Sequence, residues 1–150
     1  MRFHLIDRVL EWEPGVSVRG LKVTSHAEEF WEGEGDDAVM PPPLVLEAFC
    51  QAGTWLIMIS TERRKRAALL SVASVDFLGD VHPGDALLLE GTVESMSDEV
   101  AVLSGRVTVD GRPVLEARDV MCALIDADDL GDPDDTERLE TMLTRAGGAG

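Results

Sequence analysis

One long apolar segment constrains the fold more than any other feature of the sequence. It follows three consecutive prolines, Pro41 to Pro43, and runs from Leu44 to about Glu62 with Gly53 as its one weak helix former. Proline is accepted in the first turn of a helix, where its missing N–H would have had no partner. Apolar residues cover nearly the whole circumference of this predicted helix, and such a helix is buried on all sides. The rest of the chain must therefore wrap around it.

The segments on either side of the helix predict β-strands. Apolar and polar residues alternate or form short apolar runs between turn signals, which is typical of strands. The predicted strands span residues 16–23, 69–78, 86–95, 100–109 and 113–126. Asp110-Gly111 indicates a tight hairpin between the last two. The prediction is an α+β fold, with a long antiparallel sheet wrapped around one buried central helix. A sheet of this kind covers only part of the helix, and its open edges favour a dimer.

The chain divides into a folded domain, residues 1–125, and an acidic C-terminal tail, residues 126–150. The tail begins with the turn-rich sequence DADDLGDPDD and ends with AGGAG, for which no structure is predicted. Between them, residues 136–145 predict a short helix with Leu139, Met142 and Leu143 on one face. Such a tail is either solvated, or folded over a basic cluster of its own or a partner chain.

Charge and cysteine content exclude several classes of function. Lysine plus arginine is 13 and aspartate plus glutamate is 29, so the net charge is −16. A chain this acidic repels nucleic acid and anionic membranes. Cys50 and Cys122 lie in apolar runs and predict reduced core residues of a cytoplasmic protein. No metal-ligand spacing or phosphate-binding glycine loop occurs, so no metal, nucleotide or other cofactor is predicted.

The segment FWEGEGDDAVMPPPLVLEAFCQAG resembles the central segment of the β-hydroxyacyl-acyl-carrier-protein dehydratases, which have the hot-dog fold. The residues that carry the resemblance are Phe30, Gly33, Val39, Met40, Pro41, Leu44, Leu46, Glu47, Ala48 and Gln51. Similar motifs follow the family's order at residues 6–15, 82–87 and 109–111. The resemblance implies a dimer that acts on 3-hydroxyacyl thioesters of acyl carrier protein or coenzyme A, in fatty-acid or polyketide-type metabolism.

The resemblance also implies roles for particular residues. A carboxylate at the position of Glu47 faces the acyl tunnel and works with a histidine from the other chain. One group removes the proton α to the carbonyl, and the other protonates the leaving hydroxyl. Backbone N–H groups at the helix N-terminus polarise the thioester carbonyl. The residues expected to contact substrate are Phe30, Trp31, Met40, Pro42, Pro43, Gln51 and Phe77.

The sequence departs from the family at the positions of two catalytic groups. Glu34 stands at the position of the family's histidine, in a loop that is one residue shorter. Pro42 replaces the glycine whose amide donates to the carbonyl, and Pro43 also lacks an N–H. Removing one such donor costs about 10²–10³ in rate, and an acid–base residue supplies about 10²–10⁴. Candidate substitutes are Glu34 itself and His26. The alternative is that all three histidines are surface or strand-end residues.

Other residues keep two interpretations. Glu47 is either a ligand-contacting carboxylate or one held by a structural hydrogen bond, for instance to Gln51. Cys50 is either a packing residue of the buried helix or a nucleophile. The basic run consists of Arg63, Arg64, Lys65 and Arg66. It either compensates the helix dipole in solvent or docks an acidic carrier protein or a pantetheine phosphate.

Three functions follow from these observations. In the first, the chain is a pseudo-enzyme when alone and forms a heterodimer with another hot-dog chain that carries the histidine. In the second, it is an active homodimeric dehydratase, hydratase or thioester enzyme with a rearranged site. In the third, it binds an acyl chain or a carrier protein without catalysis.

Overall fold

The computed structural model describes residues 4–127, 133–145 and 148–149. The elements are β1 (Arg8–Glu13), β2 (Ser17–Val23), the 3-10 turn η1 (Gly35–Asp37), α1 (Pro42–Ser60), β3 (Lys65–Phe77), β4 (Ala86–Met96), β5 (Val100–Val109), β6 (Arg112–Asp126), α2 (Pro133–Thr144) and β7 (Gly148–Ala149).

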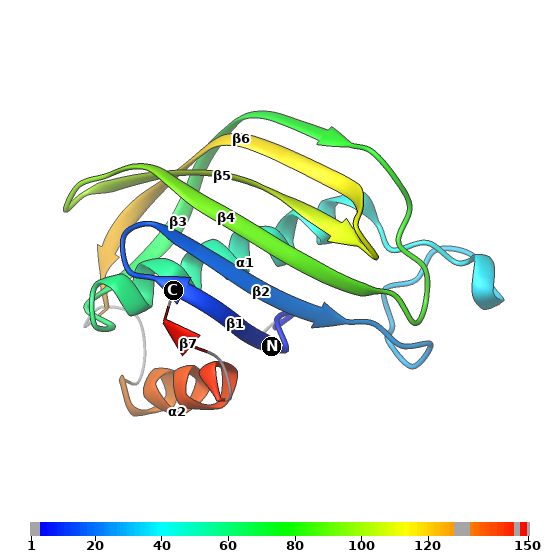
Figure 1. The fold of residues 1–150 in the computed structure, drawn as a ribbon, viewed down its shortest axis with the longest axis horizontal. Helices are drawn as coiled ribbons and strands as arrows, with labels where there is room; N and C mark the ends of the chain where they lie inside the picture. Colours follow the sequence, from blue (N-terminus) through cyan, green and yellow to red (C-terminus); the bar gives the residue numbers. More distant parts are fainter. Residues whose placement is uncertain (1–3, 128–132, 146–147, 150) are drawn as a thin grey trace.

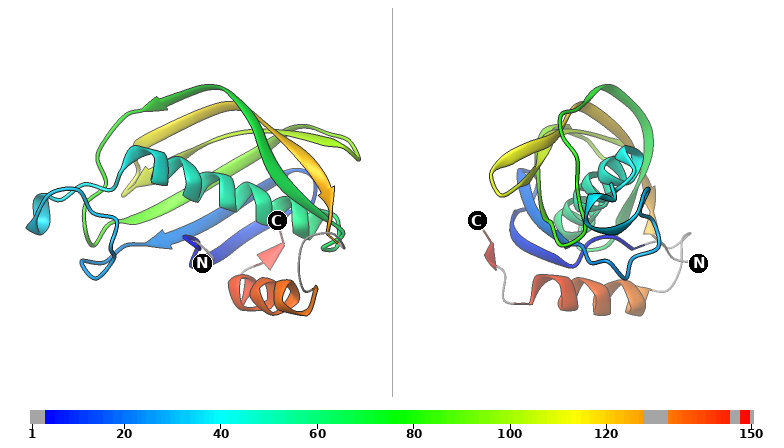
Figure 2. Two further views of the ribbon diagram at one scale, coloured as in Figure 1. Left: turned by 180° about the vertical axis from the view of Figure 1, so that it is seen from behind. Right: turned by 90° about the vertical axis from the view of Figure 1, so that its right-hand side faces the viewer.

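One strongly curved sheet wraps around α1 (Figure 1, Figure 2). The strand order is β3-β6-β5-β4-β2-β1-β7, and neighbouring strands are antiparallel except for β1 and β7. The predicted strands over residues 86–126 are confirmed as β4, β5 and β6. Asp110 and Gly111 have φ values of 50° and 78°, as a tight hairpin of this type requires.

Two glycines of the sheet lie against the helix residue Phe49. Gly91 of β4 and Gly105 of β5 are paired across the strands, and both face Phe49. A Cβ atom at Gly105 would lie 1.9 Å from the carbonyl oxygen of Glu90 and 2.8 Å from the Phe49 ring. A Cβ atom at Gly91 would make only ordinary contacts, 3.5 Å from Val18 and 3.7 Å from Phe49. Gly105 is therefore the position where only glycine fits between the strand and the helix.

The sheet covers only part of α1, as predicted, so within the single chain the helix is not buried on all sides. One face of the helix remains partly exposed, and its residues are Leu44, Leu46, Glu47, Cys50, Gln51 and Thr54. The curved sheet leaves this face open because its two ends, at β3 and at the β1–β7 pair, do not meet. By length and composition α1 would also fit a membrane span, but half of that window is buried inside the protein, as expected of a core helix.

The sequence also misplaced the end of α1. The helix ends at Ser60 and has no basic residue in its last turn. Arg63 and Arg64 lie in the following turn, while Lys65 and Arg66 begin β3. The four cations therefore lie just beyond the C-terminus of the helix, and their interpretation as solvated charges near the negative end of its dipole stays a prediction.

The chain termini differ from the predictions in three ways. Residues 8–13 form β1, although their mixed composition predicted no strand. Within α2, Leu143 is buried as predicted, but Met142 is 60% exposed instead of sharing the packed face. Gly148 and Ala149 pair with Glu11 and Trp12 of β1, although no structure was predicted there. Half of the turn-rich part of the tail, residues 128–132, lies outside the described residues.

The substitution Gly105→Ala should lower the free energy of unfolding by about 3 kcal/mol, because the new methyl group overlaps backbone and ring atoms. Urea denaturation followed by tryptophan fluorescence measures it. Gly91→Ala is the matched control, and its effect should stay within about 1 kcal/mol because its methyl group meets no close neighbour. Equal losses for the two variants would contradict this account of helix–sheet spacing.

Candidate active site

Glu47 lies on the partly exposed face of α1 and is held by Gln51, one turn further along. Gln51 Nε2 donates a hydrogen bond to Glu47 Oε1 at 3.2 Å, and Gln51 Oε1 accepts one from the backbone N–H of Leu5 at 2.8 Å. Because a backbone N–H can only donate, the orientation of the Gln51 amide is fixed. The structural hydrogen bond considered for Glu47 is therefore present. A carboxylate has about four acceptor positions, so it retains others that can meet a ligand.

The N-terminus of α1 offers no free backbone donor. Residues 41–43 are prolines, and the N–H groups of Leu44 and Val45 both point to the carbonyl oxygen of Pro41, at 2.9 and 3.4 Å. Just before the prolines, Met40 N–H donates to Val81 O at 2.9 Å and Val39 N–H donates to Glu32 O at 2.8 Å. Every N–H group from residue 39 to residue 45 is thus absent or already paired. This end of the helix cannot polarise a thioester carbonyl as the family resemblance implies.

The loop before the helix is held in place at several points. Lys22, whose side chain is 7% exposed, forms an ion pair with Glu28 at the base of the loop. Trp31 Nε1 donates to the carbonyl oxygen of Ser25 at 2.8 Å, and the Trp31 ring packs against Phe30 with centroids 4.9 Å apart. The tip of the loop, η1, projects beyond the sheet at the end of the molecule where α1 begins (Figure 1).

Neither predicted substitute for the histidine contacts Glu47 within residues 4–127. His26 Nε2 lies 2.7 Å from Asp36 Oδ1, and the His26 side chain is 61% exposed. Glu34 precedes η1 and is exposed. Both belong to the projecting loop, so a role for them at the Glu47 of this chain stays a prediction.

His82 is more firmly placed than the sequence suggested. Its Nδ1 lies 2.9 Å from the carbonyl oxygen of Ala38, so Nδ1 carries a proton and Nε2 is an acceptor in the neutral ring. Its backbone N–H donates to Asp85 Oδ2 at 2.8 Å, and its carbonyl oxygen accepts a bond from Thr24 Oγ1 at 3.2 Å. The expectation of a plain surface residue missed this role, because Ala38 and Thr24 are 44 and 58 positions away from His82 in the sequence.

An open apolar surface lies between α1 and β3. Leu69 and Phe77 of β3 pair with Cys122 and Leu115 of β6. Paired residues of neighbouring strands point to the same side of a sheet, so Leu69 and Phe77 face the helix. They are nevertheless 51% and 48% exposed. Of the other expected substrate contacts, Met40 is 1% exposed and belongs to the core.

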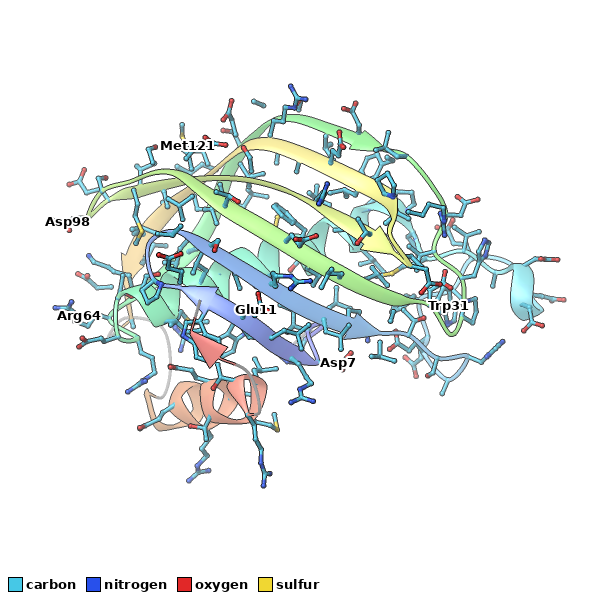
Figure 3. All side chains as sticks on the ribbon, in the orientation of Figure 1. Asp7, Glu11, Trp31, Arg64, Asp98 and Met121 are labelled. Atoms are coloured by element: carbon cyan, nitrogen blue, oxygen red, sulfur yellow. The ribbon has the colours of Figure 1, made fainter. Side chains whose placement is uncertain are left out.

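The basic cluster, residues 63–66, lies at the opposite end of α1 from the prolines (Figure 3). The 19 residues of α1 span about 28 Å at the usual rise per residue. Arg63 lies 2.9 Å from Glu140 and 3.8 Å from Glu137 of α2, and Lys65 lies 2.6 Å from Asp126. Much of the cluster's charge is therefore already paired within the chain.

The two cysteines are protonated thiols at neutral pH. Burial, followed by the charge of Glu47 and then by Cys122, raises the pKa of Cys50 to about 12. Burial also raises the pKa of Cys122. Because the thiolate is the nucleophile, these shifts favour a packing role for Cys50.

Cys50 should therefore react very slowly with iodoacetamide. Relative to an ordinary thiol of pKa 9.0, its thiolate fraction at pH 8 is about 10³-fold smaller. In a Cys122→Ser background, intact-protein mass spectrometry should show alkylation at least about 10²-fold slower than in the urea-unfolded protein. The rate should rise about tenfold per pH unit up to pH 10. Alkylation of the folded protein at the unfolded rate would contradict this assignment.

Lys22→Met should lower the free energy of unfolding by about 2–4 kcal/mol, because it leaves the largely buried Glu28 carboxylate without its cation. The double variant Lys22→Met/Glu28→Leu removes both charges and should lose less than the single variant. Urea denaturation of the three proteins provides the comparison. A double variant as unstable as the single one would show that packing, rather than the ion pair, holds the base of the loop.

An antiparallel sheet wrapped around one long helix defines the hot-dog class of proteins. The structure of smu.793 from Streptococcus mutans UA159 bound to acetyl CoA superposes with a TM-score of 0.65 at 19% identity, covering 84% of this chain and 93% of that one. PH1136 from Pyrococcus horikoshii superposes with a TM-score of 0.65 at 15% identity, covering 81% and 84%. At these identities the likeness shows the fold alone, and it confirms the predicted hot-dog architecture.

The FabA-like domain family matches residues 1–118. The relative named 3-hydroxyacyl-[acyl-carrier-protein] dehydratase FabZ from Staphylococcus haemolyticus is 38% identical over 112 residues, which are 73% of this chain and 77% of the relative. The protein of the same name from Roseiflexus castenholzii is 36% identical over 124 residues, or 81% and 86%. The chain therefore belongs to the FabA-like family. Helix α2 and strand β7 lie beyond the matched residues.

Proposed function

We propose that this chain is a 3-hydroxyacyl-thioester dehydratase-type subunit that is catalytically impaired alone and works in a mixed dimer. Its partner would be a second hot-dog chain that supplies the histidine. Relatives named as 3-hydroxyacyl-[acyl-carrier-protein] dehydratases support the substrate class. The observation that carries the proposal is the N-terminus of α1, where every backbone N–H from residue 39 to residue 45 is absent or paired.

The dehydration reaction explains why this observation matters. A base removes the proton α to the thioester carbonyl, negative charge develops on the carbonyl oxygen, and an acid protonates the departing β-hydroxyl. This chain supplies Glu47, oriented by Gln51. It lacks a histidine at position 34 and an amide donor at position 42. The combined loss corresponds to about 10⁴–10⁷ in rate if the two contributions multiply.

The edge strand β3 supports the association with another chain. Strand β3, which has 13 residues, stands at one end of the described strand order, so one of its two edges has no neighbouring strand. Long apolar edges are templates for pairing with another strand. The exposed large apolar side chains here are Leu69, Leu70, Phe77 and Leu78. A partner at this edge would cover the open face of α1, bring its own loop near Glu47 and enclose an apolar channel for the acyl chain.

The test compares the purified chain with mixed dimers. Each FabA-like chain encoded in the same genome that retains the loop histidine is co-expressed with this one, and native mass spectrometry identifies the mixed species. Both forms are then incubated with short- and medium-chain 3-hydroxyacyl thioesters of acyl carrier protein. We expect no measurable water loss by the chain alone and turnover by one mixed dimer. That turnover should fall by at least about 10²-fold when this chain carries Glu47→Gln.

Two controls separate the alternatives. The partner chain is tested alone, so that its own activity is not assigned to the mixed dimer. A mixed dimer that retains full activity with Glu47→Gln would make this chain a binding module. Glu47-dependent turnover by this chain alone would overturn the proposal, and Nε2 of His82 would then be the first group to test as the missing base.

A further inference from the structure

Helix α2 packs beside β1 and reaches the turn after α1 (Figure 1, Figure 3). It lies outside the part of the chain that the FabA-like family matches. Leu143, 1% exposed, anchors α2 to the core, and the carbonyl oxygen of Arg145 accepts a hydrogen bond from Arg8. On the same helix, Glu137 and Glu140 are three residues apart, so they share a face. Both reach Arg63.

Arg63, the basic residue that α2 contacts, belongs to an unusual part of the sequence. Residues 63–66 are the one run of four consecutive cations in a chain of net charge −16. An acidic protein approaching this chain is repelled over most of its surface, so a local positive site is needed for docking. In the structure, Arg63 forms ion pairs with Glu140 and Glu137, and Lys65 forms one with Asp126. The hydrogen bond to Glu140 also raises the pKa of Arg63.

We propose that α2 is an internal competitor that masks the basic cluster until an acidic protein surface, such as that of the carrier, displaces its carboxylates. This inference rests on the proposed function and adds regulation of carrier docking to it. The carboxylates of α2 take the positions that the acidic groups of the partner would occupy. Binding the partner and releasing α2 are then one exchange of ion pairs.

The contacts of α2 suit such an exchange. Its ion pairs are at least partly accessible to solvent, since the side chains of Glu137, Arg63 and Glu140 are 61%, 34% and 20% exposed. Accessible pairs are weak and readily replaced. Met142, on the outer side of the helix, is 60% exposed and adds nothing to the anchor. Arg63 itself lies in a turn with φ of 66°, directly after Glu62 with φ of 53°. This turn leads into β3, so a partner that forms an ion pair with Arg63 binds next to the edge strand.

The experiment measures binding of a purified acyl carrier protein in its apo form. Without the phosphopantetheine arm, occupation of the acyl channel cannot contribute to affinity. Fluorescence anisotropy at low ionic strength compares the unsubstituted chain with Glu137→Gln/Glu140→Gln. We expect the variant to bind about three- to tenfold more tightly, because the competing carboxylates are gone. Arg63→Gln/Lys65→Gln should weaken binding in both backgrounds.

A matched control removes two charges elsewhere. Asp80→Asn/Asp110→Asn makes the same change in net charge at two exposed residues. Asp80 lies beyond the end of β3 and Asp110 just before β6, whereas the basic cluster lies where β3 begins and β6 ends. It should change affinity less than about twofold, since only long-range repulsion is reduced. Hydrogen exchange of the wild-type chain should show faster exchange in residues 137–144 when the carrier is bound. Equal affinities for the two acidic double variants, or protection of α2 on binding, would overturn the proposal.

The outcome is separable from that of the proposed function. Turnover and mixed-dimer formation are measured without reference to α2, and the apo carrier supports no reaction. A chain that proves active alone, or that forms no mixed dimer, would refute the proposed function and leave the competition result intact. Tighter binding that survives Arg63→Gln/Lys65→Gln would instead place the docking site away from the cluster and refute the competition alone.

Discussion

The burial of α1 against the concave face of the sheet is the contact on which the rest of this structure depends. Residues from most of the strands pack on the helix, and the absence of a side chain at Gly105 leaves room for Phe49. Because one sheet must curve around one helix, it has two ends that do not meet. The uncovered face of α1, the apolar side of β3 and the position of Glu47 are all consequences of that geometry.

The same helix also sets what the chain can do chemically. A helix N-terminus normally leaves four N–H groups without partners, and these can stabilise a developing oxyanion. Here two of the first helical residues are prolines, and the next two N–H groups turn back to Pro41. The start of α1 is therefore well formed as a helix but has no donor to offer. Glu47 and Gln51 remain in an ordered arrangement on the exposed face, where a second chain can complete a site.

The described part of the C-terminal segment covers one edge of the sheet and leaves the other uncovered. Strand β7 pairs with β1, and α2 packs alongside, so that edge is covered by the chain itself. Within residues 4–127, 133–145 and 148–149, nothing covers the β3 edge in this way. An asymmetry of this kind directs association to one edge and prevents open-ended assembly through both. It also places the carboxylates of α2 on Arg63, next to the beginning of the open edge.

Much of this protein could be predicted from its sequence alone. Periodicity and turn residues located α1 and the strands β4, β5 and β6 to within a few residues, because those signals are local. The missing histidine and the missing amide at Pro42 were visible for the same reason, since each depends on a single residue type. The FabA-like family was also evident from motifs spread over most of the chain.

Tertiary structure decided the remainder, because it depends on partners distant in sequence. Strand β1 has no clear alternation and exists through its pairing with β2 and the burial of Val9. The bond from Leu5 that fixes Gln51, and the one from His82 that holds Ala38, join residues 46 and 44 positions apart. The contact of Arg63 with Glu140 spans 77 positions. Sequence periodicity indicates which face of a helix or strand is buried. Only the folded chain determines which residues pack against that face.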